Sequence, residues 1–235
     1  MAKSYRIYKA SEFAKLELDI PWLVEGLVPA YGISLIYADP KIGKSIISAQ
    51  LMYSLANGVP WLGFKVPKKV NVIYLQADEP IPEWSHQLRE TLKTVQEGWS
   101  TAALPPGALL DPQLVAELKE DLKAYQFVVY DALISLFAYP EIKSATVAGH
   151  LLQQIRNLHP GPSWVIHHKV KGQQGVPRST NTAAAGSFAL GAGVSMLYDL
   201  SPRQLIALGR VVSAKVNLKR TPEGLWVADD TLMLS

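Results

Sequence analysis

A short apolar segment, ISLIY at residues 33–37, leads directly into the polar sequence ADPKIGKS and then into apolar residues at helical spacing. This order predicts a buried strand, a tight loop and a helix over residues 45–57, which Asn57-Gly58 ends. A glycine followed by lysine and serine where the helix begins is the pattern of a phosphate-binding loop. Backbone amides and the helix dipole at that point favour a bound anion.

The loop assignment gives each residue type a purpose. We expect Lys44 to reach the terminal phosphates of a nucleotide and the Ser45 hydroxyl to bind Mg²⁺. The Walker A pattern GxxxxGK[ST] is met except at its first position, where Ala38 keeps a small residue in place of glycine. ATP and Mg²⁺ are the expected ligands. The residues predicted to hold them are Ala38, Asp39, Pro40, Lys41, Ile42, Gly43, Lys44, Ser45 and Ile46.

Strand-like and helix-like segments alternate through the rest of the chain. Further strands are expected at 70–77, 126–131 and 163–168, helices at 83–97, 112–124 and 144–158, and three strands at 194–200, 204–212 and 225–227. Asp111-Pro112 is a typical helix start. Such alternation predicts an α/β fold with a mostly parallel twisted sheet, helices on both faces and antiparallel C-terminal edge strands. Scattered charges and two prolines make residues 1–30 look like an arm rather than core, and we divide the chain into an arm or linker at 1–25 and a domain at 26–235.

Composition narrows the class of protein. The chain is 49% hydrophobic and 18% charged, which is ordinary for a soluble globular domain. It has no cysteine, so disulfides and thiolate metal sites are excluded. No apolar run is long enough for a membrane span, and we expect a cytoplasmic protein. The net charge of +3 predicts that any contact with nucleic acid is local.

Carboxylates follow two of the predicted strands. Asp131 ends the run FVVY and is expected to hold Mg²⁺ through its water shell. Asp78 and Glu79 end the strand at 70–77, and a carboxylate at the tip of the strand next to the loop strand would face the γ-phosphate and its attacking water. Which of these two acts is left open, and a solvated acidic turn is the simpler alternative.

Two adjacent histidines end a third predicted strand. Neighbouring strand residues point to opposite faces, so we expect only one of His167 and His168 to reach the nucleotide and sense its γ-phosphate. The glycine-rich loop behind them carries Lys169, Lys171 and Arg178, which suit the backbone of single-stranded nucleic acid. A solvated loop tip is the alternative, since this loop has no aromatic residue for base stacking.

Cations near the C-terminus have two interpretations of equal weight. They could reach the γ-phosphate of a neighbouring subunit, as arginine fingers do. They could equally be the charges of an edge strand that discourage aggregation. The residues concerned are Arg210, Lys215, Lys219 and Arg220.

Several segments together resemble a known family. They occur in the order found in the RecA-like ATPase domain of the RepA type, which is that of the hexameric plasmid-replication helicases and their phage and bacterial relatives. The segments are WLVEGLVP at residues 22–29, DPKIGKS, ANGVPWLG, VIYLQADE, VVYDALISL, VIHHKVKG and AAGSFALGAGVSMLYDL. The resemblance covers residues 20–220. DPKIGKS and VVYDALISL are shared by many NTPases, whereas the double histidine together with AAGS is more specific.

The resemblance implies a RecA-like core that assembles as a ring, often a hexamer, with ATP between subunits. It places the catalytic glutamate of the family on Asp78, with Glu79 one step along, and a γ-phosphate sensor on His168 or His167. The family often has arginine where this chain has Ala185, and a Lys-x-Arg pair where Lys215 is followed by Asn217. A lysine that acts on the neighbouring subunit is therefore expected at Lys215, with an arginine finger missing or displaced to Arg220.

Three functions follow as hypotheses. The first is an ATP-hydrolysing motor on single-stranded DNA, a helicase or translocase in replication or recombination, which assembles with itself and works with partner proteins. The second is a recombinase-like or DNA-repair accessory ATPase. The third is a nucleotide-gated assembly module with little turnover, which the altered carboxylate register and the missing arginine suggest.

Overall fold

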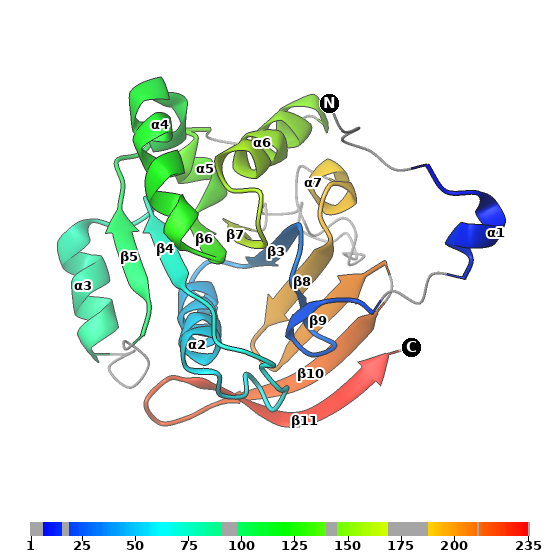
Figure 1. Cartoon of the computed structure of the whole chain (residues 1–235). Helices are drawn as coiled ribbons and strands as arrows, with labels where there is room; N and C mark the ends of the chain where they lie inside the picture. The colour runs from blue at the N-terminus through cyan, green and yellow to red at the C-terminus, as the bar shows by residue number, and fades with distance from the viewer. Residues whose placement is uncertain are drawn as a thin grey trace, which may run out of the picture.

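The computed structural model describes residues 7–15, 19–90, 98–139, 145–168, 188–210 and 212–234. Its centre is a nine-stranded sheet in the order β11-β10-β9-β8-β3-β7-β6-β4-β5 (Figure 1). Six neighbouring strands are parallel: β3 (Ile33–Ala38), β4 (Val72–Gln76), β5 (Ser100–Ala103), β6 (Phe127–Asp131), β7 (Ser163–His168) and β8 (Met196–Ser201). Antiparallel strands extend this half: β9 (Gln204–Gly209), β10 (Ser213–Arg220) and β11 (Trp226–Leu234).

Helices cover both faces of the sheet, as predicted, and each face has its own core. One core packs α2 (Lys44–Asn57) and α3 (Ile81–Glu90) against the sheet together with a small hairpin of β1 (Trp22–Val24) and β2 (Val28–Pro29). The other core contains α4 (Pro112–Asp121), α5 (Leu133–Leu136), α6 (Ala145–Leu158) and α7 (Phe188–Ala192), with the short 3₁₀ turns η1 (Ala108–Leu110) and η2 (Leu122–Ala124). Helix α1 (Ala10–Phe13) lies apart from this body (Figure 1).

Alternation along β3 explains why one strand serves both cores. Ile36 points into the α2 core, whereas Leu35 and Tyr37 point into the α6 core. All six residues of β3 are buried, as expected for the central strand of a parallel sheet. The buried position of β3 fixes where the phosphate loop begins.

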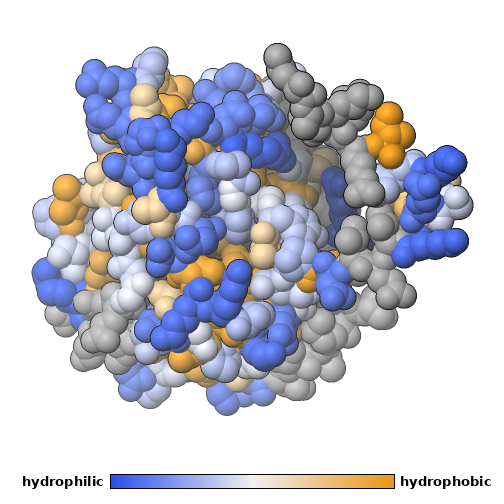
Figure 2. Space-filling view, in the orientation of Figure 1, coloured by the Kyte–Doolittle hydropathy of each residue, from blue (hydrophilic) through white to orange (hydrophobic). Residues whose placement is uncertain are grey.

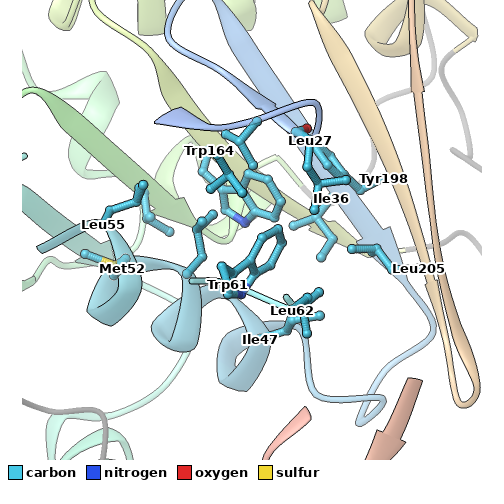
Figure 3. Packing of buried hydrophobic residues seen from close by; sticks show 14 of the residues in the cluster. Leu27, Ile36, Ile47, Met52, Leu55, Trp61, Leu62, Trp164, Tyr198 and Leu205 are labelled. Atoms are coloured by element: carbon cyan, nitrogen blue, oxygen red, sulfur yellow. The ribbon is translucent and has the colours of Figure 1, made fainter. Parts of the chain in front are cut away.

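The α2 core is built around aromatic rings (Figure 3). Trp164 of β7 packs edge-on against Trp61, with ring centroids 6.0 Å apart, and lies 4.5 Å from the ring of Tyr198. Its indole nitrogen donates a hydrogen bond of 2.9 Å to the Ser48 hydroxyl of α2. These contacts hold the helix that follows the phosphate loop against the sheet.

Most sequence-based boundaries agree with the structure within a few residues. Asp111 caps α4 as predicted, since its Oδ1 accepts hydrogen bonds from the amides of Gln113 and Leu114 at 2.9 and 3.4 Å. One prediction about the sheet is wrong, since the strand at 196–201 is parallel to β3 rather than part of the antiparallel edge. The structure also contains strand β10 at 213–220, which is absent from the predicted strands.

The expectation that residues 1–30 lie outside the core is wrong for the β1–β2 hairpin. Leu23 is 4% exposed, and Val24, Leu27 and Val28 are fully buried in the α2 core. The Tyr198 hydroxyl donates a hydrogen bond of 2.6 Å to the Leu27 carbonyl. The division into an arm at 1–25 and a domain at 26–235 stays a prediction, but these contacts tie the end of the proposed arm to the sheet.

Hydrophilic side chains cover most of the face seen in Figure 2, and hydrophobic side chains appear there in small separate groups. Among the described residues, no helix has the length and hydropathy that crossing a membrane requires.

Candidate functional site

The loop between β3 and α2 has the backbone geometry of an anion-binding turn. Lys41 and Gly43 have positive φ angles of 64° and 104°, and Gly43 is the N-cap of α2. No side chain caps this helix end. The first amides of a helix have no partner within the helix, so they are available to a ligand at this position.

A cavity of about 370 Å³ opens over this helix end. It brings together residues from the phosphate loop, the ends of β4, β6 and β7, helix α3 and the end of β10. Its lining consists of Pro40, Lys41, Gly43, Lys44, Ser45, Ile46, Asp78, Glu79, Gln87, Asp131, His168 and Arg220. Of the remaining loop residues, Ala38 and Asp39 face Lys44 with their carbonyls, and Ile42 packs partly against the α2 core.

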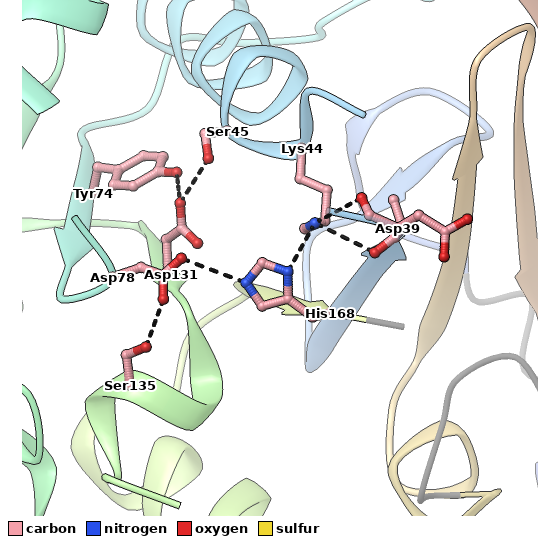
Figure 4. Close-up of polar contacts among 9 residues, drawn as sticks. Asp39, Lys44, Ser45, Tyr74, Asp78, Asp131, Ser135 and His168 are labelled. Carbon is pink, nitrogen blue, oxygen red and sulfur yellow. Dashed lines mark hydrogen bonds and ion pairs between the residues drawn. The ribbon is translucent and has the colours of Figure 1, made fainter. Parts of the chain in front are cut away.

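A chain of polar contacts runs from the loop lysine across the cavity (Figure 4). Lys44 Nζ lies 3.3 Å from the carbonyl oxygens of Ala38 and Asp39 and 3.2 Å from Nδ1 of His168. His168 Nε2 lies 3.4 Å from Asp78 Oδ2. The hydroxyl of Ser135 donates to the other oxygen of Asp78 at 2.7 Å.

The lysine determines which nitrogen of His168 carries the proton. An ammonium group can only donate, so Nδ1 has to accept and the proton of the neutral ring lies on Nε2, towards Asp78. Contact with His168, helped by the hydrogen bond from Ser135, lowers the pKa of Asp78 against the opposing effect of burial. Asp78 is therefore an ionised carboxylate with both oxygens engaged.

Asp131 lies deeper in the same cavity. It is 5% exposed, and its Oδ2 accepts hydrogen bonds from the Ser45 hydroxyl at 3.0 Å and from the Tyr74 hydroxyl. Burial raises the pKa of Asp131, although both hydrogen bonds oppose that effect. The ring of Tyr74 stacks on Trp84 of α3 with centroids 4.9 Å apart, which fixes the hydroxyl that reaches Asp131.

Glu79 stands beside these groups with a different electrostatic character. Burial raises its pKa, and the charges of Asp131, Asp78 and Glu83 add to the effect. It lines the cavity without being the carboxylate that holds His168. A carboxylate with a raised pKa close to a phosphate site is better suited to accept a proton than Asp78 is.

The strand order corrects one part of the geometric reasoning. Strand β4, which carries Asp78 and Glu79, is not next to β3, because β7 and β6 lie between them. The two carboxylates reach the cavity because they follow the last residues of β4 at the carboxyl edge of the sheet, where the loop after β3 also lies.

The two histidines lie in different surroundings. The side chain of His168 is 29% exposed and lines the cavity, whereas His167 is buried at 3% and is absent from the lining. Alternation along β7 accounts for the difference.

The cations near the C-terminus differ in whether they line the cavity. Arg220 lines the cavity of its own chain, where its guanidinium donates to the carbonyl oxygens of Ile42 and, at 3.0 Å, Gly224. Lys215 is half-buried on β10, opposite Ile206 and Leu232, and is not among the lining residues.

Some site residues escaped the sequence analysis, and some predicted ones cannot be placed. Tyr74, Gln87 and Ser135 belong to the site but carry no motif of their own. The predicted nucleic-acid contacts Lys169, Lys171 and Arg178, together with Ala185, lie outside the described residues.

Comparison with known proteins supports the interpretation of this cavity as the nucleotide site of an ATPase. The family model described as an AAA domain, AAA_25, matches residues 11–174, which is more than half of the chain. The chain belongs to the AAA_25 family. No curated protein matches the sequence.

Solved structures show that this AAA domain has a RecA-like fold. A KaiC-like protein from Pyrococcus horikoshii OT3 is similar with a TM-score of 0.55 at 12% identity, over 88% of this chain and 94% of that chain. The RadB recombinase is similar with a TM-score of 0.52 at 14% identity, over 88% of this chain and 93% of that chain. At these identities the likeness establishes the fold alone.

The donor set of this AAA domain fits Mg²⁺. The ion prefers oxygen ligands and keeps several waters, so one hydroxyl and one carboxylate beside bound phosphates suffice. Ser45 and Asp131 provide this pair at 3.0 Å. No cluster of three or more His, Cys, Asp or Glu side chains suited to a metal is found within the described residues, so a cation here would depend on the nucleotide for further ligands.

Proposed function

We propose that this chain binds and hydrolyses ATP with Mg²⁺ as cofactor. The observation that carries the proposal is the convergence of Lys44, Ser45 and Asp131 on the open N-terminus of α2, in one cavity with Glu79 and His168. Lys44 would bind the β- and γ-phosphates, and the loop amides from Ile42 to Ile46 would surround them. Ser45 and Asp131 would hold the ion, which supplies charge neutralisation when it is bound.

Glu79 is the better candidate for orienting the attacking water. Both oxygens of Asp78 are engaged by Ser135 and His168, so Asp78 would act by positioning His168. This assignment departs from the register implied by the RepA-type resemblance, which places the catalytic carboxylate on Asp78.

His168 would report the state of the γ-phosphate. Its Nδ1 accepts from Lys44 in this structure, and a terminal phosphate would compete for the same lysine. Withdrawal of Lys44 would leave Nδ1 to a new partner at the last residue of β7. The segment that follows in the sequence carries Lys169, Lys171 and Arg178, which are the proposed contacts with single-stranded DNA.

We propose that the protein uses ATP to move on single-stranded DNA. It would act in the cytoplasm as a homo-oligomer such as a hexameric ring, with replication or recombination proteins as partners. The RepA-type sequence pattern supports the helicase or translocase form. A recombinase-like or repair-accessory ATPase is supported equally, because one structural neighbour is the RadB recombinase. A nucleotide-gated assembly module with little turnover is the third candidate. At the position where the RepA-type resemblance expects the catalytic glutamate, this chain has Asp78, whose two oxygens already contact Ser135 and His168.

An ATPase assay with and without single-stranded DNA tests these proposals. Lys44→Ala should abolish nucleotide binding. Glu79→Gln should keep binding and lower turnover by about 100-fold or more, whereas Asp78→Asn should lower it less. If Glu79→Gln turns over like wild type while Asp78→Asn is inactive, the assignment of the base is wrong.

The effect of single-stranded DNA on the ATPase rate distinguishes the three candidate functions. Stimulation of the ATPase supports the motor and the recombinase, and electron microscopy then distinguishes closed rings from helical filaments. Tight ATP binding without measurable turnover supports the assembly module. Absence of both DNA binding and stimulation would contradict the first two candidates.

A further inference from the structure

The end of the β10–β11 hairpin contacts the backbone of the phosphate loop at the edge of the cavity, which Arg220 also lines. Arg220 donates a hydrogen bond to the carbonyl of Ile42, and the indole nitrogen of Trp226 donates to the carbonyl of Gly43 at 3.2 Å. The guanidinium carbon of Arg220 lies 4.3 Å from the centre of the Trp226 ring. Two side chains of one hairpin therefore hold two consecutive carbonyls of the loop.

The hairpin is in turn fixed to helix α2. Gln50 donates to the carbonyl of Trp226 at 2.8 Å and accepts from its amide at 2.9 Å. Trp226 is 2% exposed within the α2 core. Figure 1 shows the turn between β10 and β11 curving beneath α2. The grip on the loop is thus part of the packed domain.

Peptide planarity gives this grip a consequence for ligand binding. The carbonyl and the N–H of one trans peptide unit point in opposite directions. The carbonyl of Ile42 shares its unit with the N–H of Gly43, and the carbonyl of Gly43 shares its unit with the N–H of Lys44. Arg220 holds the Ile42 carbonyl, and Trp226 together with the amide of Ile47, at 3.1 Å, holds the Gly43 carbonyl. The N–H groups of Gly43 and Lys44 therefore point the opposite way, towards the phosphate position.

We propose that Arg220 and Trp226 are positioning residues that preorganise the phosphate-binding amides of their own chain. Arg220 then acts in cis through the backbone of the loop, rather than as a finger on the nucleotide of a neighbouring subunit. The inference rests on the proposed nucleotide site and names the part of the fold that sets its affinity.

Binding of fluorescent ADP and ATP analogues to the dilute protein tests the inference. Trp226→Phe removes the indole donor but keeps an aromatic ring beside the charged Arg220, and Arg220→Ala removes the second donor. Each should weaken binding by about three- to tenfold, the equivalent of one hydrogen bond. ADP and ATP should lose affinity by the same factor, because amides at the helix N-terminus do not depend on the γ-phosphate.

Lys219→Ala is the matched control for charge. It removes one cation from the same hairpin, but Lys219 pairs with Asp229 at 2.6 Å and both side chains are exposed. It should stay within twofold of wild type. Thermal denaturation of each variant checks that the fold is retained.

The outcomes separate this inference from the proposed function. Failure of the wild-type protein to bind either nucleotide would remove the proposed function and the inference together. Nucleotide binding by wild type with equal affinity in Trp226→Phe and Arg220→Ala would overturn the inference alone. A loss confined to ATP would also overturn it, since it would indicate direct contact of Arg220 with the γ-phosphate.

Discussion

Alanine substitutions at three glycines can measure how much the contacts around the phosphate loop contribute to stability. Gly43 combines a φ of 104° with close neighbours, because a Cβ added there would overlap the Arg220 guanidinium and lie 3.1 Å from Nε1 of Trp226. Gly63 has a φ of 85° but no atom within 4 Å of an added Cβ. Gly149 lies in α6 and is also open. Substitution by Ala at these positions separates backbone strain from crowding.

The expected magnitudes follow from this difference. Gly149→Ala should stabilise the protein by about 0.5–1 kcal/mol, since Gly is the poorer helix former. Gly63→Ala should destabilise it by about 1–2 kcal/mol through the positive φ alone. Gly43→Ala carries at least this strain, since its φ of 104° lies further from the left-handed well, and it also displaces the donors that hold the loop. The displacement adds about 1–3 kcal/mol and gives about 2–5 kcal/mol in all.

Melting temperature and nucleotide affinity are the two measurements. For a chain of 235 residues, about 2–4 °C per kcal/mol predicts a fall of about 4–20 °C for Gly43→Ala and about 2–8 °C for Gly63→Ala. Only Gly43→Ala should also lose nucleotide affinity. Equal melting temperatures for the two variants would refute the reasoning, because the hairpin contacts would then contribute nothing to the loop.

Three other changes have definite expected outcomes. Burial raises the pKa of Asp131, so the charge of Asp131 destabilises the fold above the folded-state pKa and has no effect below the unfolded value of about 3.9. Asp131→Asn should therefore raise the melting temperature when Mg²⁺ and nucleotide are absent. This gain should shrink on acidification, and a gain that grows instead would contradict the argument. Ser48→Ala leaves the buried indole N–H of Trp164 without its acceptor and should cost about 1–3 kcal/mol in urea denaturation, which an unchanged midpoint would disprove. Mixing Lys44→Ala with Lys215→Ala should restore part of the ATPase activity if Lys215 serves the neighbouring subunit, and no recovery would place Lys215 outside the site.

Sequence reasoning located the site because it located the ends of strands. Parallel strands present their carboxyl ends at one edge of the sheet, so the sequence alone predicts that Lys44, Asp131 and His168 meet. The order of the strands was not accessible in this way. Nothing in the local sequence says that β7 and β6 lie between β3 and β4, and the placement of Asp78 beside the loop strand was wrong for that reason.

The missed features have identifiable causes. The pattern SAKVNLKR alternates buried Ala214, Val216 and Leu218 with polar residues, and this period of two is typical of a strand such as β10. The β1–β2 segment WLVEGLVP is rich in apolar residues, but it is short, and these residues become core only through tertiary contact with α2 and Tyr198, which the local sequence does not show. The grip of Arg220 on its own loop depends on tertiary approach of the hairpin.

The contacts of Lys44 change how ligand binding should be understood. Its ammonium already has the carbonyls of Ala38 and Asp39 and the ring of His168 as partners. An incoming phosphate therefore exchanges existing polar contacts for new ones, so the enthalpy of binding should be modest. Arg220 and Trp226 already hold the backbone of the loop, so we expect little chain entropy to be lost when the ligand binds. Calorimetry should therefore show a small binding enthalpy, because the phosphate replaces partners that Lys44 already has.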